Sequence, residues 1–342
     1  MPEPTLNSED IPAVPFTDEQ KYIFDVRGWI AVPGLLTDDD VAEMREFCGL
    51  LRSDSASLPE KDRSSVGGPL HRLTDHPVVV GFMEEFVAHA PLASDDGYGF
   101  RLDGSFFMTR SAGDDSFRPH GGNGMLRFPG NHHTYNSLPG AANSGLTRVV
   151  WELNPVSRGT GGTLFLSGSH KAAFPAPAST ESIDSDLWDT YDCPAGSVLF
   201  FTEAIRHTGA VWTNEDHDRV AVFNCYNTVG SKWHKWEAHP DLVASMPYKR
   251  RSLFRPVHCQ DNRVEAAVRR CVLSSQPVRC AFAWASLRTH RHSGGDETLR
   301  RKRNACTWTA RRRRAPVSTN GPWSSSSRRR RARRTCPRRR TS

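Results

Sequence analysis

Two histidines and one arginine are the residues of this sequence best suited to chemistry at a single site: His120, His207 and Arg219. His120 lies in a glycine-rich turn, His207 follows a polar corner, and Arg219 begins an apolar run. Imidazole is a good ligand for first-row metals, and a planar guanidinium binds a carboxylate through two parallel hydrogen bonds. Because the histidines are far apart in the sequence, only the fold can bring them together. These residues predict a metal site beside a carboxylate-binding arginine.

The segments around His207 and Arg219 are predicted to be strands. Residues 197–201 form a short, β-branched apolar run after a Pro-Ala-Gly turn signal, and residues 219–226 form a second run. We expect the strands that carry His207 and Arg219 to be antiparallel neighbours. The two side chains would then lie at the mouth of an otherwise apolar layer.

Helical patterns precede these strands in the chain. Thr17 begins a helix with a capping box, since Gln20 stands three residues later, and Thr37 begins a second helix. A third helix is predicted over residues 78–89, and from about residue 97 the pattern changes to short strands. Helices followed by many short strands favour a β-sandwich or barrel with a helical layer on one face.

The net charge of +7 is an average over two unlike parts. Residues 1–260 contain 22 Lys and Arg against 34 Asp and Glu, a net of −12, and residues 261–342 contain 23 against 4, a net of +19, which sum to +7. We therefore predict an extended arm over 1–16, a folded domain over 17–256 and a disordered, arginine-rich tail over 257–342. The tail has three readings: an RNA- or phosphate-binding arm, a solvated extension, or an out-of-frame extension of the gene.

The sequence lacks the marks of export or membrane insertion. The N-terminus has neither a basic region nor an apolar region, and no apolar run approaches the ~18 residues of a membrane span. No C-terminal peroxisomal signal and no C-x-x-C pair occurs, so the cysteines of the folded part are expected to be reduced core residues. We expect a cytoplasmic protein without a membrane partner.

Three motifs, in this order and spacing, resemble those of the phytanoyl-CoA dioxygenase family of Fe(II)/2-oxoglutarate oxygenases. They are FTDEQKYIFDVRGWIAVPGLLTDDDVAEMR, GTGGTLFLSGSHK and AGSVLFFTEAIRHTGAVW, and the likeness extends from about residue 16 to about residue 230. The resemblance implies a mainly β fold with flanking helices, a double-stranded β-helix (jelly roll, cupin-like). It also implies Fe(II), O₂ and the co-substrate 2-oxoglutarate. His120 and His207 would then bind iron, and Arg219 would bind the distal carboxylate of 2-oxoglutarate.

The sequence departs from this family at the third iron ligand. The family pattern is His-x-Asp, whereas this chain has His120-Gly121-Gly122, and glycine has no side chain that could bind iron. In the first explanation another carboxylate substitutes, either Glu203, if its corner is folded back toward His207, or one of Asp114 and Asp115. In the second, chloride fills the position, as in related iron halogenases. In the third, the site is inactive or has water as its third ligand.

The resemblance thus predicts a dioxygenase that hydroxylates a small organic substrate and converts 2-oxoglutarate to succinate. The alternatives are an iron/2-oxoglutarate halogenase and a non-catalytic jelly-roll binding protein. Nucleic acid is a partner only if the arginine-rich tail is genuine. The sequence predicts neither the substrate nor the oligomeric state.

Overall fold

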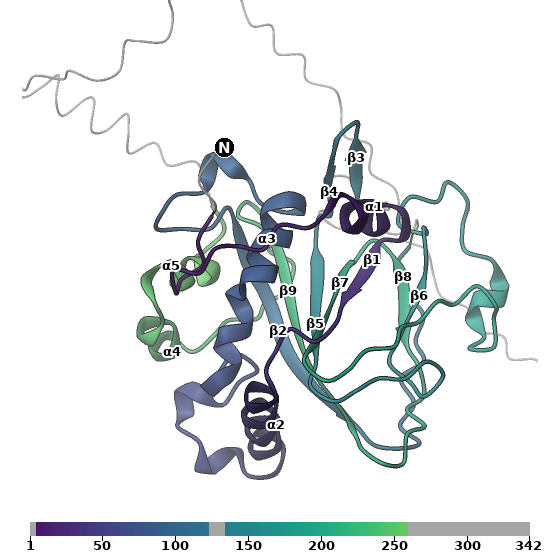
Figure 1. The fold of residues 1–342 in the computed structure, drawn as a ribbon, viewed down its shortest axis with the longest axis horizontal. Helices are drawn as coiled ribbons and strands as arrows, with labels where there is room; N and C mark the ends of the chain where they lie inside the picture. The colour runs from purple at the N-terminus through teal and green to yellow at the C-terminus, as the bar shows by residue number, and fades with distance from the viewer. Residues whose placement is uncertain (1–4, 123–133, 259–342) are drawn as a thin grey trace, which may run out of the picture. The chain divides into compact units, whose positions relative to one another are not determined.

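A computed structural model describes residues 5–122 and 134–258, which all belong to the first of two units in the chain, Met1–Arg270. The predicted tail lies outside the described residues, apart from residues 257 and 258. Helices and strands alternate with short 3-10 segments and loops (Figure 1). The order is α1 (Asp18–Arg27), β1 (Trp29–Val32), α2 (Asp38–Ser53), α3 (Pro77–Phe86), β2 (Phe100–Arg110), β3 (Asn136–Leu138), β4 (Ala141–Asn143), β5 (Thr147–Glu152), β6 (Thr163–Leu166), β7 (Ser197–Thr202), β8 (Arg206–Gly209), β9 (Arg219–Thr228), α4 (Pro240–Ser245) and α5 (Tyr248–Arg251).

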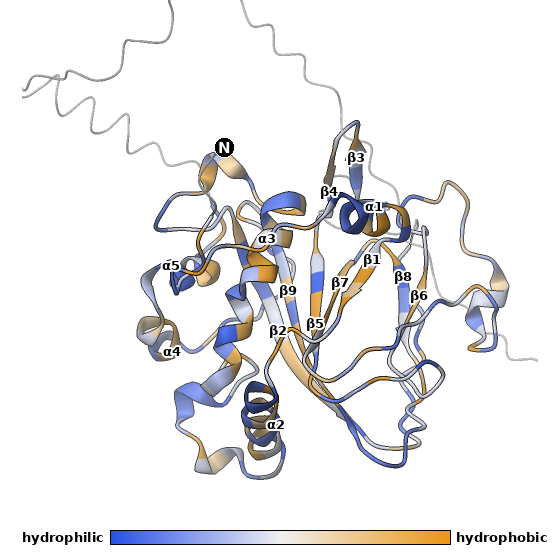
Figure 2. Ribbon diagram, viewed as in Figure 1, coloured by the Kyte–Doolittle hydropathy of each residue, from blue (hydrophilic) through white to orange (hydrophobic). Residues whose placement is uncertain are grey.

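The main sheet has five antiparallel strands in the order β1-β7-β5-β9-β2. The central strand β5 alternates strictly between its two faces. Val149 and Trp151 point to the helical side, whereas Arg148, Val150 and Glu152 point to the other side. Figure 2 shows a hydrophilic segment on β5, in contrast to the hydrophobic strand β7 beside it. Arg148 and Glu152 are therefore charged residues on the inward face of a buried strand, where a ligand could bind.

A second, two-stranded sheet pairs β6 with β8, with Phe165 opposite His207 and Thr163 opposite Gly209 (Figure 1). The prediction that His207 and Arg219 lie on neighbouring strands is therefore wrong. His207 belongs to the small sheet and Arg219, on β9, to the main sheet. The interior between the two sheets contains both residues.

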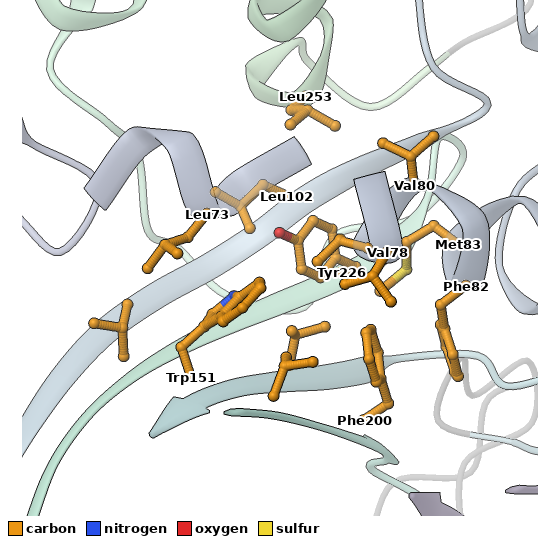
Figure 3. Close-up of a cluster of buried hydrophobic side chains, with 14 of the residues drawn as sticks. Leu73, Val78, Val80, Phe82, Met83, Leu102, Trp151, Phe200, Tyr226 and Leu253 are labelled. Atoms are coloured by element: carbon orange, nitrogen blue, oxygen red, sulfur yellow. The ribbon is translucent and has the colours of Figure 1, made fainter. Parts of the chain in front are cut away.

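Helices α1, α2 and α3 cover the outer face of the main sheet. The capping box predicted at Thr17 is present: the Thr17 hydroxyl accepts from the amide of Gln20, and the Gln20 side chain accepts from the amide of Thr17. The predicted cap at Thr37 is also confirmed. Figure 3 shows how Phe82 of α3 packs against Phe200 of β7, with ring centroids 4.5 Å apart. These contacts hold the main sheet in place behind the site.

The inner face of the main sheet packs toward the small sheet through a second apolar cluster. Its members include Val150, Leu199, Phe201, Phe165 and Trp212, all nearly or fully buried. The predicted class, mainly β with flanking helices in a jelly-roll arrangement, is confirmed. No helix in the described ranges is both long and apolar enough to cross a membrane.

Candidate metal centre

The two predicted histidine ligands lie side by side. His120 and His207 form an isolated antiparallel bridge, in which each backbone amide donates to the other residue's carbonyl at 3.0 and 2.9 Å. Their ring centroids are 4.2 Å apart. The glycine-rich turn after β2 thus becomes an extra partner of β8, and this pairing fixes the exposed His120 beside the buried His207.

Each imidazole is oriented by a carbonyl two residues before it in the chain. Nδ1 of His120 lies 2.8 Å from the carbonyl oxygen of Arg118, and Nδ1 of His207 lies 2.9 Å from that of Ile205. A carbonyl can only accept, so each Nδ1 carries the proton and donates it. In a neutral imidazole of this tautomer, Nε2 is the unprotonated nitrogen, which is the atom that binds a metal.

Glu203 completes a group of three candidate ligands. The turn between β7 and β8 is closed by the amide of Ile205 donating to the carbonyl of Thr202 at 3.1 Å, which folds the corner back. Oε2 of Glu203 then lies 3.8 Å from Nε2 of His207. One ligand atom from each of His120, Glu203 and His207 lies within 4.8 Å of the other two. In the described residues, neither Asp114 nor Asp115 joins this group, because their carboxylates accept from nearby backbone amides.

The carboxylate of Glu203 is held by a buried arginine on β5. Nε and Nη2 of Arg148 lie 2.7 and 2.6 Å from Oε1 of Glu203. Burial raises the pKa of Glu203, but the charge and hydrogen bond of Arg148, together with His207 and His120, outweigh this effect and lower the pKa to about 2. Glu203 is therefore ionised at neutral pH. Both guanidinium contacts go to Oε1, which leaves Oε2 directed at the histidines.

His207 is kept neutral by its surroundings. Burial lowers its pKa to about 4, although Glu203 opposes the shift. A neutral imidazole beside an ionised carboxylate needs no deprotonation before a cation binds, so His207 and Glu203 could bind a metal ion without losing a proton.

The position that the family fills with an aspartate is a tight backbone turn here. Gly122 has φ +85°, and its amide donates to the carbonyl of Ala204 at 2.9 Å. A Cβ on Gly122 would lie 3.1 Å from Cβ of Arg206. A carboxylate-bearing residue is strained at this position. The same backbone path brings residues 120–122 against the corner that carries Glu203.

The predicted carboxylate-binding arginine, Arg219, is fully buried in the interior. Its Nε donates to Glu152 at 3.1 Å, and Nη2 contacts Glu152, the Thr163 hydroxyl at 3.2 Å and the Tyr191 hydroxyl at 3.1 Å. Nη1 is buried with no hydrogen-bond partner among the described residues. An unpaired buried donor on a cation is costly, and an anion could satisfy it.

Sequence reasoning missed Arg148, Glu152 and Tyr191. The hydroxyl of Tyr191 donates to Glu152 at 2.6 Å, and burial raises its pKa, so it stays a neutral donor. A signal for the other two was present in the strand Thr-Arg-Val-Val-Trp-Glu, where Arg148 and Glu152 share one face of an apolar run. Tyr191 lies in a polar loop and gave no such signal.

No protein-family model matches the sequence, and a comparison with curated proteins finds no match either. Solved structures of HygX from Streptomyces hygroscopicus are similar. The form with nickel and 2-oxoglutarate bound has 23% identity and a TM-score of 0.52 over 66% of this chain and 94% of HygX. The form that also has hygromycin B bound has 22% identity and a TM-score of 0.51 over 66% and 94%. This chain shares the fold of HygX.

Proposed function

We propose that this protein is an Fe(II)- and 2-oxoglutarate-dependent dioxygenase of the phytanoyl-CoA dioxygenase type. It hydroxylates a small organic substrate and decarboxylates 2-oxoglutarate to succinate. The convergence of ligand atoms from His120, Glu203 and His207 within 4.8 Å carries this proposal. Two imidazoles and one carboxylate are the ligand set of non-haem Fe(II) oxygenases.

The three side chains have separate tasks in this site. His120 and His207 offer Nε2 because each Nδ1 proton is donated to a backbone carbonyl. Glu203 offers Oε2 because Arg148 occupies Oε1. Bound Fe(II) with 2-oxoglutarate supplies the oxidising chemistry, and the protein supplies orientation and a water-poor interior.

Arg219 is proposed to hold the distal carboxylate of 2-oxoglutarate. Its free Nη1 fits a carboxylate oxygen, and the hydroxyls of Thr163 and Tyr191 lie beside the same guanidinium. Gly209, opposite Thr163, is two residues from His207, which is about 7 Å along a strand. A five-carbon dicarboxylate can bridge this interval from the metal ligands to Arg219.

The likeness to HygX supports the same proposal. HygX binds iron in one structure, nickel with 2-oxoglutarate in another, and hygromycin B in a third. A small-molecule substrate is therefore reasonable for this chain as well.

The position of Glu203 favours hydroxylation over halogenation. A halogenase site needs a vacancy where chloride replaces the ligand carboxylate. Here an ionised carboxylate lies 3.8 Å from His207, so that place is already taken by a negative charge. The same carboxylate supports an active metal site over a merely structural jelly roll.

The test is an anaerobic titration of the full-length protein with Fe(II) and then 2-oxoglutarate. We expect one iron per chain and a visible metal-to-ligand charge-transfer band that requires both additions. His120→Ala and His207→Ala should each lose the metal and the band. His217→Ala, which removes a half-buried histidine outside the group, is the matched control and should behave as wild type. Retention of iron by both histidine variants would refute the oxygenase proposal.

A further inference from the structure

A second arginine faces Arg219 across the strands β2 and β9. Arg110 and Arg219 are directly opposite in the register, so both side chains point to the same face of the sheet. Arg110 is 6% exposed and Arg219 is fully buried. Like charges directly opposite one another destabilise a sheet, and burial strengthens the repulsion.

The charges in this part of the interior do not balance. Glu152 is the carboxylate paired with Arg219, and Tyr191 is neutral. Arg110 donates from Nη1 to the carbonyl of Ala210 at 2.7 Å, and its Nε lies 2.9 Å from Sδ of Met108. Within residues 5–122 and 134–258, no carboxylate lies within ion-pair distance of Arg110. Two guanidiniums therefore share one buried carboxylate, since Asp114, which also attracts Arg110, is exposed, and a further negative group would balance the charge.

The guanidinium of Arg110 lies against Gly209, which is two residues from His207 on β8. A Cβ on Gly209 would be 2.8 Å from Nη2 of Arg110 and 2.0 Å from Oγ of Ser116. Gly209 and His207 are two residues apart on β8, so they share one face of that strand. Only the missing side chain of Gly209 lets Arg110 and Ser116 approach here. Oγ of Ser116 is buried and has no partner among the described residues.

We propose that Arg110 is a second guanidinium for the distal carboxylate of 2-oxoglutarate, which it holds together with Arg219 while the hydroxyl of Ser116 donates a further hydrogen bond. This inference rests on the proposed function. The proposed anion site then contains two cations, Arg110 and Arg219, and its ligands are 2-oxo acids with a second carboxylate. Burial and the charge of Arg219 lower the pKa of Arg110 to about 10, so Arg110 remains a cation at neutral pH.

Thermal stability with and without 2-oxoglutarate distinguishes a ligand-binding role of Arg110 from a purely structural role. A carboxylate between two opposed cations relieves their repulsion, so 2-oxoglutarate should stabilise the wild-type protein strongly. Removal of Arg110 should relieve the same repulsion without a ligand. The ligand-free melting temperature should then hold or rise, while the stabilisation by 2-oxoglutarate shrinks.

The experiment measures binding to the full-length protein loaded with Ni(II), by calorimetry and thermal melting. The probes are 2-oxoglutarate and 2-oxobutyrate, which has the same 2-oxo acid group without the distal carboxylate. We expect Arg110→Met to weaken 2-oxoglutarate binding roughly 10- to 100-fold and to leave 2-oxobutyrate binding unchanged. Ser116→Ala should weaken it a few-fold. Arg158→Met, at an exposed arginine paired with Asp192, is the control and should change neither affinity.

Wild-type affinity of Arg110→Met for 2-oxoglutarate, or an equal loss for both 2-oxo acids, would overturn the inference. If Arg110→Met does not fold, Arg110→Lys decides. This variant keeps the charge but loses the planar fork, so it should weaken 2-oxoglutarate alone, and unchanged binding would count against Arg110. The proposed function fails separately, if the wild-type protein binds no 2-oxoglutarate or if Arg219→Lys binds it as wild type does.

Discussion

Two buried arginine–glutamate pairs lie at opposite ends of the inward face of β5, and they leave different atoms unused. Arg148 binds Oε1 of Glu203 with two nitrogens, so a carboxylate oxygen is left over, beside His207. Glu152 binds Nε and Nη2 of Arg219, so a guanidinium nitrogen is left over. The same two residue types thus offer a negative group at one end and a positive group at the other.

The comparison shows that an ion pair by itself does not identify a ligand site. A buried pair of one arginine and one glutamate is neutral and often only structural. A ligand site is indicated by the polar atom of the pair that has no hydrogen bond, and by the groups that lie next to that atom. An unbonded oxygen beside two imidazoles is suited to a metal cation, whereas an unbonded nitrogen beside a second arginine is suited to an anion.

An aromatic pair connects the two arginines. The guanidinium of Arg148 lies 5.4 Å from the ring centroid of Phe106, and that of Arg219 lies 5.7 Å from that of Phe223. The two rings are stacked with centroids 4.6 Å apart and planes 7° apart. The cation–π contacts orient both guanidiniums from the same column. Phe106 is 41% exposed, so the column reaches the open end of the interior.

The largest expected effect comes from the carboxylate that faces the metal. Glu203→Ala should reduce Fe(II) affinity by about a factor of 100 or more, because it removes one of three ligands. Added chloride should not restore the affinity or change the spectrum. Iron content after anaerobic gel filtration, with and without chloride, measures both effects. A mild loss together with a chloride-dependent spectrum would instead support the halogenase alternative.

Glu203→Ala also leaves Arg148 buried without its partner, which costs about 3–5 kcal/mol. The double variant Arg148→Met/Glu203→Gln removes both charges and serves as the control for folding. It should melt close to wild type and still fail to bind iron. Recovery of iron binding in this variant would mean that Glu203 is not a ligand.

At the Glu152 end of β5, removal of the Arg219 cation should weaken the binding of 2-oxoglutarate but not that of Fe(II). The double variant Arg219→Met/Glu152→Gln removes the ion pair without leaving a buried charge. It should weaken 2-oxoglutarate binding by roughly 10- to 100-fold and leave Fe(II) affinity within a few-fold of wild type. Calorimetry with each ligand tests this separation. Equal losses of iron and 2-oxoglutarate would show that the two ends are not distinct sites.

Loss of the support behind Glu203 should have an intermediate effect. Arg148→Lys keeps a positive charge but cannot make two contacts to Oε1, so Glu203 is less well oriented. Iron affinity should fall by about 10-fold, less than in Glu203→Ala, while 2-oxoglutarate binding to the metal-free protein stays unchanged. The d–d spectrum of the Co(II)-loaded protein reports the changed coordination. A spectrum and affinity identical to wild type would remove Arg148 from the positioning of the site.

The helix caps and the strands next to the site could be predicted because each follows from a local sequence pattern. The capping signals at Thr17 and Thr37 and the apolar runs before His207 and after Arg219 follow from residues within a few positions of one another. His120 was predicted through its resemblance to the first ligand position of an oxygenase family. The structure places it beside His207, and its role as an iron ligand stays a prediction.

The rest depends on contacts between distant strands. The placement of β8 in a separate sheet opposite β9 could not be deduced from two adjacent runs, since both pairings satisfy the same pattern. Whether Glu203 reaches His207 depends on a turn that closes between Thr202 and Ile205, and an extended corner would have separated them. The facing of Arg110 and Arg219 is set by the register of β2 and β9, which the sequence does not specify.

The smallest expected effect tests whether the aromatic pair transmits anything between the two ends. Phe106→Leu removes the ring that lies between Arg148 and Phe223 but keeps an apolar side chain of similar size. Each cation–π contact at a partly exposed site contributes about 0.5–1 kcal/mol, so iron and 2-oxoglutarate affinities should each fall only a few-fold. Binding of one ligand in the presence and absence of the other measures the coupling directly. If 2-oxoglutarate strengthens iron binding equally in wild type and Phe106→Leu, the coupling arises from the metal-bound co-substrate alone, and the column only orients two independent arginines.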